Sequence, residues 1–400
     1  MNYINIQSEI GRLRRVVIHR PGHELKNLTP KFLSELLFDD IPFLVDAQKE
    51  HDEFASLLKK EKVEVIYLED LFQEAIKDEK VRLTFLYSYF KENDIVDSHD
   101  QEKLIKYFQQ LSLPALVEKI FSGVTEEEFP SFNEGRLRSF IDDYPFIIDP
   151  MPNLYFTRDP AFILGNHLSI SRMASSARRR ETLIMETILK TNSNLVGNIP
   201  LYSRNNISSL EGGDILALGK DKILIGLSER SEPAGIEKLA ENAFKNSDIR
   251  EIYALNLPKK RSFMHLDTVL TQVDGDKFVA HHQFISHSEC FRIFPKRKSV
   301  GISVENGSLG KVLSKIIKKP ALVIPCGGNS RIASDREQWN DGANTLALAP
   351  GKVIAYKRNY ETNRMLELNG VKVIPTTSSE LARGRGGPRC MSMPLYRDEI

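Results

Sequence analysis

The sequence predicts an α/β fold built from repeated β-hairpin modules, with one all-helical insertion. Three observations lead to this fold class. Pairs of apolar runs bracket turns that contain glycine, which is a β-hairpin signal. A polar motif precedes each hairpin, and a helical stretch follows it. One long stretch departs from this pattern, because it is rich in helix formers and poor in hairpins.

The hairpin modules recur along the chain. Four are clear, and each joins a polar motif to two apolar runs: Arg-Asp-Pro at 158–160 with 161–170, Glu-Gly-Gly-Asp at 211–214 with 215–227, His-Leu-Asp at 265–267 with 268–281, and Asn-Asp-Gly at 340–342 with 343–356. The first three are spaced by roughly 50 residues, a period typical of radial or solenoid repeats. The run at 14–19 is a candidate start of a further copy. If the modules close around an axis, their polar motifs line a single pocket.

The helical stretch lies between the first copy and the later ones, at residues 72–143. Leu104, Ile105, Phe108 and Leu111 fall on one helical face, and a second apolar face follows at 113–121. No chemically active residues cluster there, so we interpret it as an extra packing layer. The predicted domains are therefore a catalytic α/β domain, 1–71 with 144–400, and a helical insertion, 72–143.

Composition excludes several classes of function. The chain has 400 residues and a net charge of +1, which gives no electrostatic case for a nucleic-acid or anionic-membrane partner. No apolar run approaches the roughly 20 residues of a membrane-spanning helix, and the first residues do not form a secretory signal. The three cysteines are too few and too far apart for a disulfide framework or a metal knuckle. We therefore expect a cytoplasmic protein.

Cys390 is the candidate nucleophile. It follows Arg383, Arg385 and Arg389 in a glycine-rich segment, and positive potential favours a thiolate. Glycines let the backbone approach a ligand closely. The alternative is a buried structural thiol at the edge of a C-terminal strand, and the residues alone do not decide between the two. The other two cysteines lack a cationic setting, so we interpret them as structural.

His265 and Asp267 are a candidate acid–base pair. Residues two apart in a strand point to the same face, so we expect both side chains in one pocket. A hydrogen-bonded histidine near a surface acid is the alternative. Glu211 and Asp159 stand in polar motifs that are otherwise ordinary turns.

No metal is expected. His281 and His282 are adjacent, but neighbours in a strand face opposite ways, and no further ligand flanks them. Short basic runs at 178–180, 259–261 and 296–298 are typical of solvated surface. A substrate that carries a carboxylate nevertheless needs a bidentate partner, and arginine has that geometry.

Together these motifs resemble the arginine deiminase family along essentially the whole chain. The matching stretches are 37–42, 153–160, 211–214, 264–268, 340–346, 358–359 with 362–363, and 380–395. Each is weak alone, whereas their order and combination are specific. The resemblance implies the pentein fold, a five-bladed α/β propeller with a helical insertion. It also implies hydrolysis of free L-arginine to L-citrulline and ammonia, as the first step of arginine fermentation.

The resemblance implies five catalytic roles. Cys390 is similar to the nucleophile that attacks the guanidinium carbon, leaving a covalent S-alkylthiouronium. Asp159 and Asp267 match the carboxylates that hold the guanidinium nitrogens. His265 matches the general acid–base, and Glu211 matches its acidic partner. This chemistry needs no metal and no organic cofactor.

The resemblance also implies a set of substrate-binding residues. One group grips the α-carboxylate or lines the channel for the substrate side chain: Asn153, Phe156, Arg178, Arg230, Gly384 and Arg385. The choice between Arg178 and Arg180 stays open at this point. We expect L-arginine as the small-molecule partner, and a homo-oligomer, either dimer or tetramer.

Alternatives to this function remain. A related guanidine-modifying pentein, such as an agmatine deiminase or an amidinotransferase, shares the Cys, His and acid chemistry. It differs in the recipient or in the substrate tail, and the arginine cluster favours free arginine. A protein of another class, a catalytically silent arginine-binding or surface protein, would lack the nucleophile or the histidine, and both are present.

Overall fold

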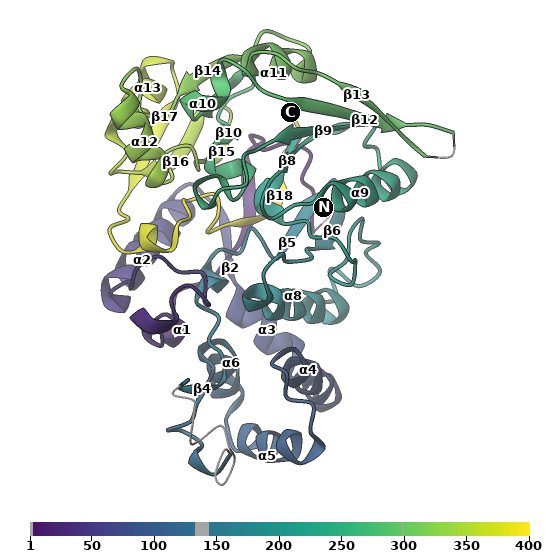
Figure 1. Ribbon diagram of the computed structural model, residues 1–400, viewed down its shortest axis with the longest axis vertical. Helices are drawn as coiled ribbons and strands as arrows, with labels where there is room; N and C mark the ends of the chain where they lie inside the picture. Colours follow the sequence, from purple (N-terminus) through teal and green to yellow (C-terminus); the bar gives the residue numbers. More distant parts are fainter. Residues whose placement is uncertain (1–2, 133–143, 298) are drawn as a thin grey trace.

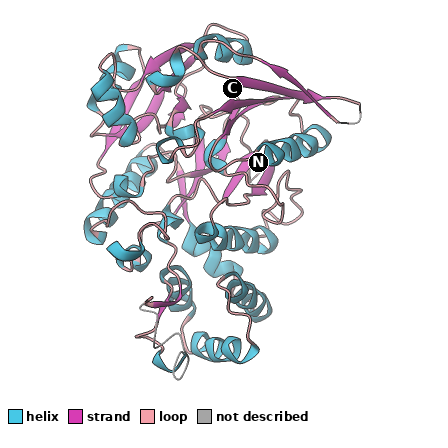
Figure 2. Ribbon diagram, viewed as in Figure 1, coloured by secondary structure: helices cyan, strands magenta, loops and turns pink. Residues whose placement is uncertain are grey.

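The computed structural model describes residues 3–132, 144–297 and 299–400 (Figure 1). Strands gather in the upper part of the view and helices lie around them, whereas the lower end is almost entirely helical (Figure 2). The four predicted hairpins are confirmed as antiparallel pairs. They are β5 (Ala161–Leu164) with β6 (His167–Ile170), β7 (Ile215–Gly219) with β8 (Lys222–Leu227), β10 (Leu270–Gln272) with β11 (Lys277–Ala280), and β15 (Leu346–Ala349) with β16 (Lys352–Tyr356).

After most hairpins, a helix leads the chain back to a further strand, which pairs in parallel with one strand of the hairpin. Parallel neighbours require such a crossover, usually a helix. Three crossovers are simple: α2 (Leu44–Lys60) leads to β2 (Glu64–Tyr67), α9 (Pro233–Asn246) to β9 (Glu251–Asn256), and α13 (Tyr360–Leu368) to β17 (Lys372–Thr376). The fourth parallel strand, β14 (Leu322–Pro325), pairs with β11. The repeated unit is therefore a hairpin, a helix and a parallel strand.

The predicted further copy near the N-terminus exists, but its hairpin is split. β1 (Leu13–Ile18) pairs in antiparallel fashion with β18 (Met393–Arg397), from the opposite end of the chain. With the parallel partner β2, they form the three-stranded sheet β18-β1-β2. The chain ends thus complete a fifth unit.

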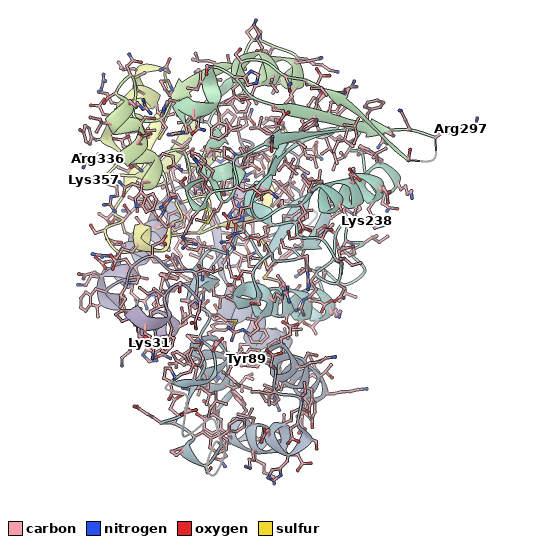
Figure 3. The ribbon with its side chains drawn as sticks, viewed as in Figure 1. Lys31, Tyr89, Lys238, Arg297, Arg336 and Lys357 are labelled. Atoms are coloured by element: carbon pink, nitrogen blue, oxygen red, sulfur yellow. The ribbon has the colours of Figure 1, made fainter. Side chains whose placement is uncertain are left out.

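The remaining elements connect or extend these units. They are α1 (His23–Lys26), α8 (Arg179–Thr191), α10 (His282–Ile285), α11 (Leu309–Ile317), α12 (Arg331–Trp339), β12 (Cys290–Pro295), β13 (Val300–Val304), and the short 3-10 turns η1 (Pro30–Phe32), η3 (Pro152–Tyr155), η4 (Ser176–Arg178), η5 (Gly212–Asp214), η6 (Arg261–Phe263), η7 (Leu266–Thr268) and η8 (Leu381–Gly384). β12 and β13 extend the β9-β8-β7 sheet to five strands and project from the body, with Arg297 near their tip (Figure 3). Across the described ranges, no helix is long and apolar enough to cross a membrane.

The five units contact one another in a closed order. β18 contacts β5, η5 contacts η7, and β1 contacts β15. Between these contacts, the amide of Gly212 donates to the carbonyl of Asp159, and the Thr271 hydroxyl donates to the carbonyl of Ala343. The polar motifs that precede the hairpins therefore meet around a common axis, as the repeat pattern predicts.

The insertion is helical where it is described. It contains α3 (Leu68–Ala75), α4 (Glu79–Glu92), α5 (Ser98–Gln109), α6 (Leu113–Ser122), a short pair β3 (Val124–Thr125) with β4 (Phe146–Ile148), and the 3-10 turn η2 (Pro130–Phe132). Asp78 and Asp97 cap the helices α4 and α5 by accepting from backbone amides. Residues 133–143 of the predicted insertion lie outside the described residues, and the domain boundaries stay a prediction.

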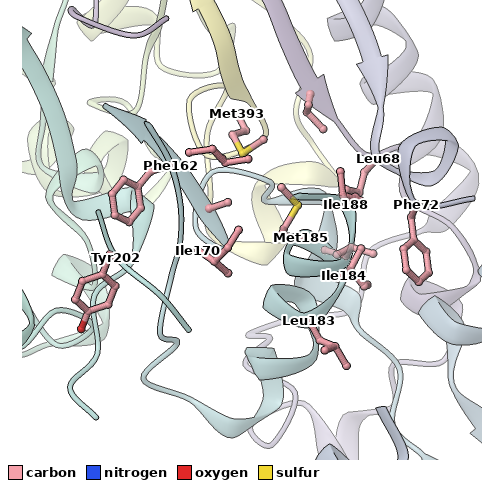
Figure 4. Packing of buried hydrophobic residues seen from close by; sticks show 14 of the residues in the cluster. Leu68, Phe72, Phe162, Ile170, Leu183, Ile184, Met185, Ile188, Tyr202 and Met393 are labelled. Atoms are coloured by element: carbon pink, nitrogen blue, oxygen red, sulfur yellow. The ribbon is translucent and has the colours of Figure 1, made fainter. Parts of the chain in front are cut away.

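One continuous hydrophobic cluster joins the insertion to the β units. On α8, Ile184 and Ile188 lie between α3, which supplies Leu68 and Phe72, and the β5–β6 hairpin (Figure 4). Met393 at the start of β18 belongs to the same cluster. Burial of apolar surface on this scale is the main favourable term in folding, so α8 fixes the insertion against the units around the axis.

Candidate active site

Cys390 lies in the last turn before β18, where the polar ends of the units meet. Its amide donates to Oδ1 of Asn344 at 3.0 Å, and its carbonyl accepts from the amide of Arg158 at 3.1 Å. Gly387 lies so close to Asn344 that a Cβ there would be 2.7 Å from the Asn344 carbonyl oxygen. Only glycine permits this approach, which explains part of the glycine run that precedes the cysteine.

A narrow pocket lies beside Cys390. Side chains from all parts of the chain line it: Leu37, Asn153, Phe156, Asp159, Arg178, Arg230, Arg261, Met264, His265, Gly384, Arg385 and Cys390. Nine of the predicted site residues are in this set. Of the other two, Asp267 contacts Cys390 directly and Glu211 contacts His265. The structure thus brings the whole predicted set together.

The predicted cationic setting of Cys390 is wrong for the unliganded pocket. Burial, Asp267 and Asp159 raise the pKa of the Cys390 thiol well above its usual range, and Arg389 opposes this only in part. Asp267 Oδ2 lies 3.4 Å from Sγ. Arginines that flank the cysteine in sequence are engaged elsewhere: Arg389 donates to Asp267 and Arg383 pairs with Asp40. Residues adjacent in a turn point in different directions. The charges next to Cys390 in sequence therefore did not predict the electrostatic potential at its thiol.

His265 is held as a cation by buried carboxylates. Its Nε2 lies 2.8 Å from Oε2 of Glu211, and its Nδ1 lies 3.7 Å from Oδ1 of Asp159. Burial disfavours the charge, but Asp159, Glu211 and Asp214 outweigh it and raise the pKa of His265 to about 9. At neutral pH the ring is therefore an imidazolium, with Nε2–H donating to Glu211 and Nδ1 facing Oδ1 of Asp159.

The strand expected through 265–267 is not present. His265 is an extended residue that caps the 3-10 turn η7, and Asp267 lies within that turn, before β10 begins. Both side chains nevertheless reach the Cys390 region, because the tight turn brings Asp267 under the thiol. The shared location was predicted correctly, and the strand used to explain it was wrong.

Asp159 and Asp267 each keep one carboxylate oxygen without a hydrogen bond. Oδ2 of Asp159 accepts from Arg178 at 2.5 Å, and Oδ2 of Asp267 accepts from Arg389 at 2.8 Å. In the described parts of the chain, Oδ1 of either residue makes no hydrogen bond although both atoms are buried, and the His265 ring lies 3.7 Å from Oδ1 of Asp159. Leaving a buried acceptor unpaired costs about 1–3 kcal/mol. Two such acceptors near one thiol fit a ligand that carries several N–H groups.

The same pocket presents arginine donors that make no hydrogen bond. Arg230 Nε and Arg385 Nε and Nη1 are buried and make no hydrogen bond to any described residue. Arg385 adopts a positive φ of 65° and stacks on the Trp339 ring, with 3.4 Å between the guanidinium carbon and the ring centroid. These free N–H groups suit a carboxylate, for which arginine is the preferred planar partner.

Arg178 and Arg180 occupy different environments. Arg178 lines the pocket, where its guanidinium pairs with Asp159 and Glu181. Arg180 turns away and donates to the carbonyl oxygens of Asp149 and Pro150. The geometry therefore favours Arg178 of the two for contact with a bound ligand.

Asn153, Phe156 and Gly384 shape the side of the pocket. Asn153 is fixed by a 2.7 Å hydrogen bond from its Nδ2 to the carbonyl of Leu36. A Cβ on Gly384 would lie 3.1 Å from Phe156 and far closer to the Tyr155 hydroxyl. The glycine thus allows the C-terminal segment to pack directly on the aromatic wall.

The argument against a metal at His281 and His282 assumed that a strand continues through both residues, and this assumption is wrong. The strand β11 ends at Ala280, so His281 caps α10 and His282 begins it. The two rings lie on the same side, with centroids 4.3 Å apart, and Asp335 approaches both. These residues do not line the pocket of Cys390.

Sequence reasoning assigned no role to several residues that position the site. Asn344 Nδ2 lies 3.0 Å from Cys390 Sγ, and Arg389 links Asp267 to Glu9. Asp214 accepts from two serine hydroxyls and the Leu266 amide, with a pKa raised by burial to about 7. For Asn344, the available signal was its place in the 340–346 stretch, which is one of the stretches that resemble the family. No motif in the sequence indicated a role for Glu9.

Comparison with known proteins agrees with this geometry. The arginine deiminase family profile matches residues 34–397. The chain is 45% identical to the arginine deiminase of Treponema denticola, covering 100% of both chains, and 44% identical to that of Clostridium perfringens, covering 99% of this chain and 98% of the relative.

Solved structures share the fold at low sequence identity. One is an amidinotransferase of the saxitoxin biosynthetic pathway from Microseira wollei, with a TM-score of 0.57, 16% identity and coverage of 99% and 98%. Another is a dimethylarginine dimethylaminohydrolase from Pseudomonas aeruginosa complexed with citrulline, with a TM-score of 0.53, 16% identity and coverage of 96% and 99%. Both likenesses confirm the predicted pentein fold. The family profile and the full-length relatives show that the chain belongs to the arginine deiminase family of hydrolases.

Proposed function

We propose that this chain hydrolyses L-arginine to L-citrulline and ammonia through a covalent intermediate on Cys390. One observation carries the proposal: buried carboxylate oxygens and arginine N–H groups that make no hydrogen bond gather around one pocket, with Asp267 in contact with its Cys390 thiol. L-arginine carries a guanidinium at one end and an α-carboxylate at the other, so its two charged ends complement both sets. Family membership supports the same substrate.

The guanidinium binds between Asp159 and Asp267. Each carboxylate offers its free Oδ1 to the N–H groups, and this holds the guanidinium carbon near Sγ of Cys390. Positioning matters because delocalised charge makes that carbon a poor electrophile. The bound cation also offsets the two carboxylates that raise the thiol pKa, so substrate binding itself favours loss of the thiol proton to solvent and leaves the Cys390 thiolate.

The first half-reaction releases ammonia. The thiolate attacks the guanidinium carbon and gives a tetrahedral adduct. His265, protonated at neutral pH, donates its Nδ1 proton to the leaving amino group, and the carbon–nitrogen bond breaks. Ammonia leaves, and an S-alkylthiouronium remains on Cys390.

The second half-reaction releases citrulline. His265, now neutral, accepts a proton from water as the water oxygen attacks the thiouronium carbon. Collapse of this adduct breaks the carbon–sulfur bond and returns the thiolate, and loss of the hydroxyl proton to solvent leaves the ureido group of citrulline. Glu211 keeps its 2.8 Å hydrogen bond to Nε2 of His265 and stabilises the imidazolium that forms again.

The outer arginines select for a carboxylate. Arg230 and Arg385 provide free N–H groups, and Arg178 approaches from the wall that also holds Asp159. Agmatine lacks the carboxylate and would leave these charges unpaired, which argues against an agmatine deiminase. An amidinotransferase would share the same covalent adduct but pass the amidino group to an amine, whereas membership of the arginine deiminase family favours transfer to water. The cytoplasmic location and the homo-oligomeric state remain predictions.

The test is an assay of purified protein with L-arginine as the only amidino compound. We expect equal amounts of citrulline and ammonia to accumulate, with no need for an amine acceptor. Turnover that depends on an added amine would favour the amidinotransferase. Ligand binding without any product would instead favour the silent arginine-binding protein.

A further inference from the structure

A histidine pair and an aspartate meet at a seam between two neighbouring units. His281 and His282 follow β11, whereas Asp335 lies on α12, in the connection between β14 and β15. One ligand atom from each residue lies within 4.8 Å of the other two. No bond of the proposed reaction involves this cluster, and none of its members lines the Cys390 pocket.

The spacing of the three ligand atoms is close to that of a metal site. Asp335 Oδ1 lies 3.4 Å from Nε2 of His281 and 3.9 Å from Nδ1 of His282. Ligands at about 2.0–2.1 Å from a tetrahedral Zn²⁺ are about 3.3 Å apart. One contact with Asp335 already matches that separation, and a shift of about half an ångström in the His282 side chain would bring the other to it. The two imidazole ligand atoms lie within 4.8 Å of each other, so the same movement must also bring them closer together.

The ring of His281 is held in place by aromatic neighbours. It packs against Phe263 and Phe284, with ring centroids 5.5 Å and 6.4 Å away. Its Nδ1 is buried and makes no hydrogen bond to a described residue, so the donors of this ring are not committed elsewhere in the fold.

The cluster is also accessible from solvent. The side chains of His282 and Asp335 are 38% and 59% exposed, so an ion has a path of entry and water can complete its coordination. The next residue on α12, Arg336, lies at the periphery of the molecule (Figure 3). The one competing contact is between Nδ1 of His282 and Oγ of Ser334 at 2.9 Å, which a metal ion would replace.

We propose that His281, His282 and Asp335 bind a divalent transition metal ion such as Zn²⁺. Two imidazoles and one carboxylate are a common protein donor set for Zn²⁺ and its neighbours in the first transition row. The ion bridges α10 and α12 and so ties two units of the ring together. Its role is structural. The ligands come from segments at least 53 residues apart, which only the folded chain brings together, so binding of the ion favours the folded state.

Zn²⁺ titration of the chelator-treated, dialysed full-length protein tests the site. We expect one ion per chain by calorimetry and a rise in the thermal unfolding midpoint. His282→Ala and Asp335→Asn change exposed side chains that leave the fold intact, and each should weaken binding by more than about tenfold. His287→Ala, a nearby exposed histidine outside the cluster, is the matched control and should bind as the wild type does.

Co²⁺ spectroscopy separates this site from binding at the catalytic thiol. Co²⁺ at the proposed site has nitrogen and oxygen ligands only, so its visible bands appear without a thiolate charge-transfer band, and they persist in Cys390→Ser. They should disappear in Asp335→Asn. Three outcomes would each overturn the proposal. They are no binding by the wild type, binding by His282→Ala and Asp335→Asn as tight as that of the wild type, and a charge-transfer band that is lost in Cys390→Ser.

Discussion

Two groups of residues at the pocket differ in how completely their charges are paired. The inner groups surround the Cys390 thiol, where Glu211 pairs with His265 and Arg389 pairs with Asp267, although Oδ1 of Asp159 and of Asp267 makes no hydrogen bond to a described residue. The outer groups, Arg230 and Arg385, have guanidinium N–H groups that reach no described acceptor. The inner groups are thus largely positioned before substrate arrives, whereas the outer groups are completed only by a ligand that brings a carboxylate.

This difference separates chemistry from specificity. The inner groups act on a guanidinium, which arginine and agmatine share. The outer groups act on the α-carboxylate, which arginine alone carries. Substitutions among the inner groups should therefore affect all guanidine substrates alike, and substitutions among the outer groups should affect arginine most.

The largest expected effect is at the nucleophile. Cys390→Ala and Cys390→Ser should lower kcat by about 10⁴-fold or more, because removal of a nucleophile abolishes the covalent route. Citrulline formation from L-arginine measures this loss. Cys290 and Cys326 are buried away from the pocket, with thiol pKa values that burial raises to about 12, so their serine variants should retain turnover. Full activity of Cys390→Ala would sink the mechanism.

The next effect is on specificity. Loss of a buried charge-assisted partner typically costs about 2–5 kcal/mol, so wild-type kcat/KM should favour arginine over agmatine by at least about a hundredfold. Arg230→Ala should shrink this ratio, mainly by weakening turnover of arginine. Arg292→Ala, which breaks a surface pair with Glu251 far from the pocket, is the control and should leave the ratio unchanged. An unchanged ratio in Arg230→Ala would remove Arg230 from the groups that bind the carboxylate.

A smaller effect concerns the proton on His265. Glu211→Gln removes a negative charge that favours the imidazolium, so His265 should titrate below the wild-type value of about 9 in an NMR titration. The alkaline limb of the kcat profile should move to lower pH, with kcat reduced roughly tenfold to a hundredfold. If His265 titrates equally in both proteins, Glu211 is not its electrostatic partner.

The same raised pKa has a consequence for stability. The folded protein binds the His265 proton more tightly than the unfolded chain does, where the ordinary pKa is about 6.5. This contribution is fully present below about pH 6.5 and is lost as the pH rises through about 9. Wild-type unfolding measured across that range should show the loss, and His265→Gln should show less of it.

The smallest expected effect is that of a chelator on turnover. None of the proposed steps uses a metal, and His281, His282 and Asp335 lie outside the pocket. Prolonged treatment with a chelator should therefore leave kcat for arginine within about twofold of the untreated enzyme at a temperature well below unfolding. A loss of kcat that one specific ion restores would contradict the metal-free chemistry.

Local patterns predicted more of the fold than of the electrostatics. The hairpins were readable because each has its own turn and paired apolar runs, as at Gly165 and Gly351. The pairing of β1 with β18 could not be predicted in this way, because no turn joins the two strands and their contact depends on closure of the ring of units. Pairings between the chain ends leave no local signal.

For the site, residue identities were predictable and their environments were not. Cys390 appeared cationic from its neighbours in sequence, yet the nearest charges in space are the carboxylates of Asp267 and Asp159. His281 and His282 appeared to diverge because a strand was assumed to continue through them, whereas the strand ends one residue earlier. Both errors have the same cause: side-chain direction is set by the turn, and a one-residue change in its position redirects the side chain.

The most direct measurement is the mass of the Cys390 peptide after acid quench during turnover. Wild-type protein mixed with L-arginine and quenched within a single turnover should yield a Cys390 peptide heavier by arginine less ammonia. The same gain should be absent in Cys390→Ser and absent from the peptides that contain Cys290 and Cys326. Steady production of citrulline with no adduct on Cys390 at any quench time, or with the adduct on another cysteine, would contradict the account.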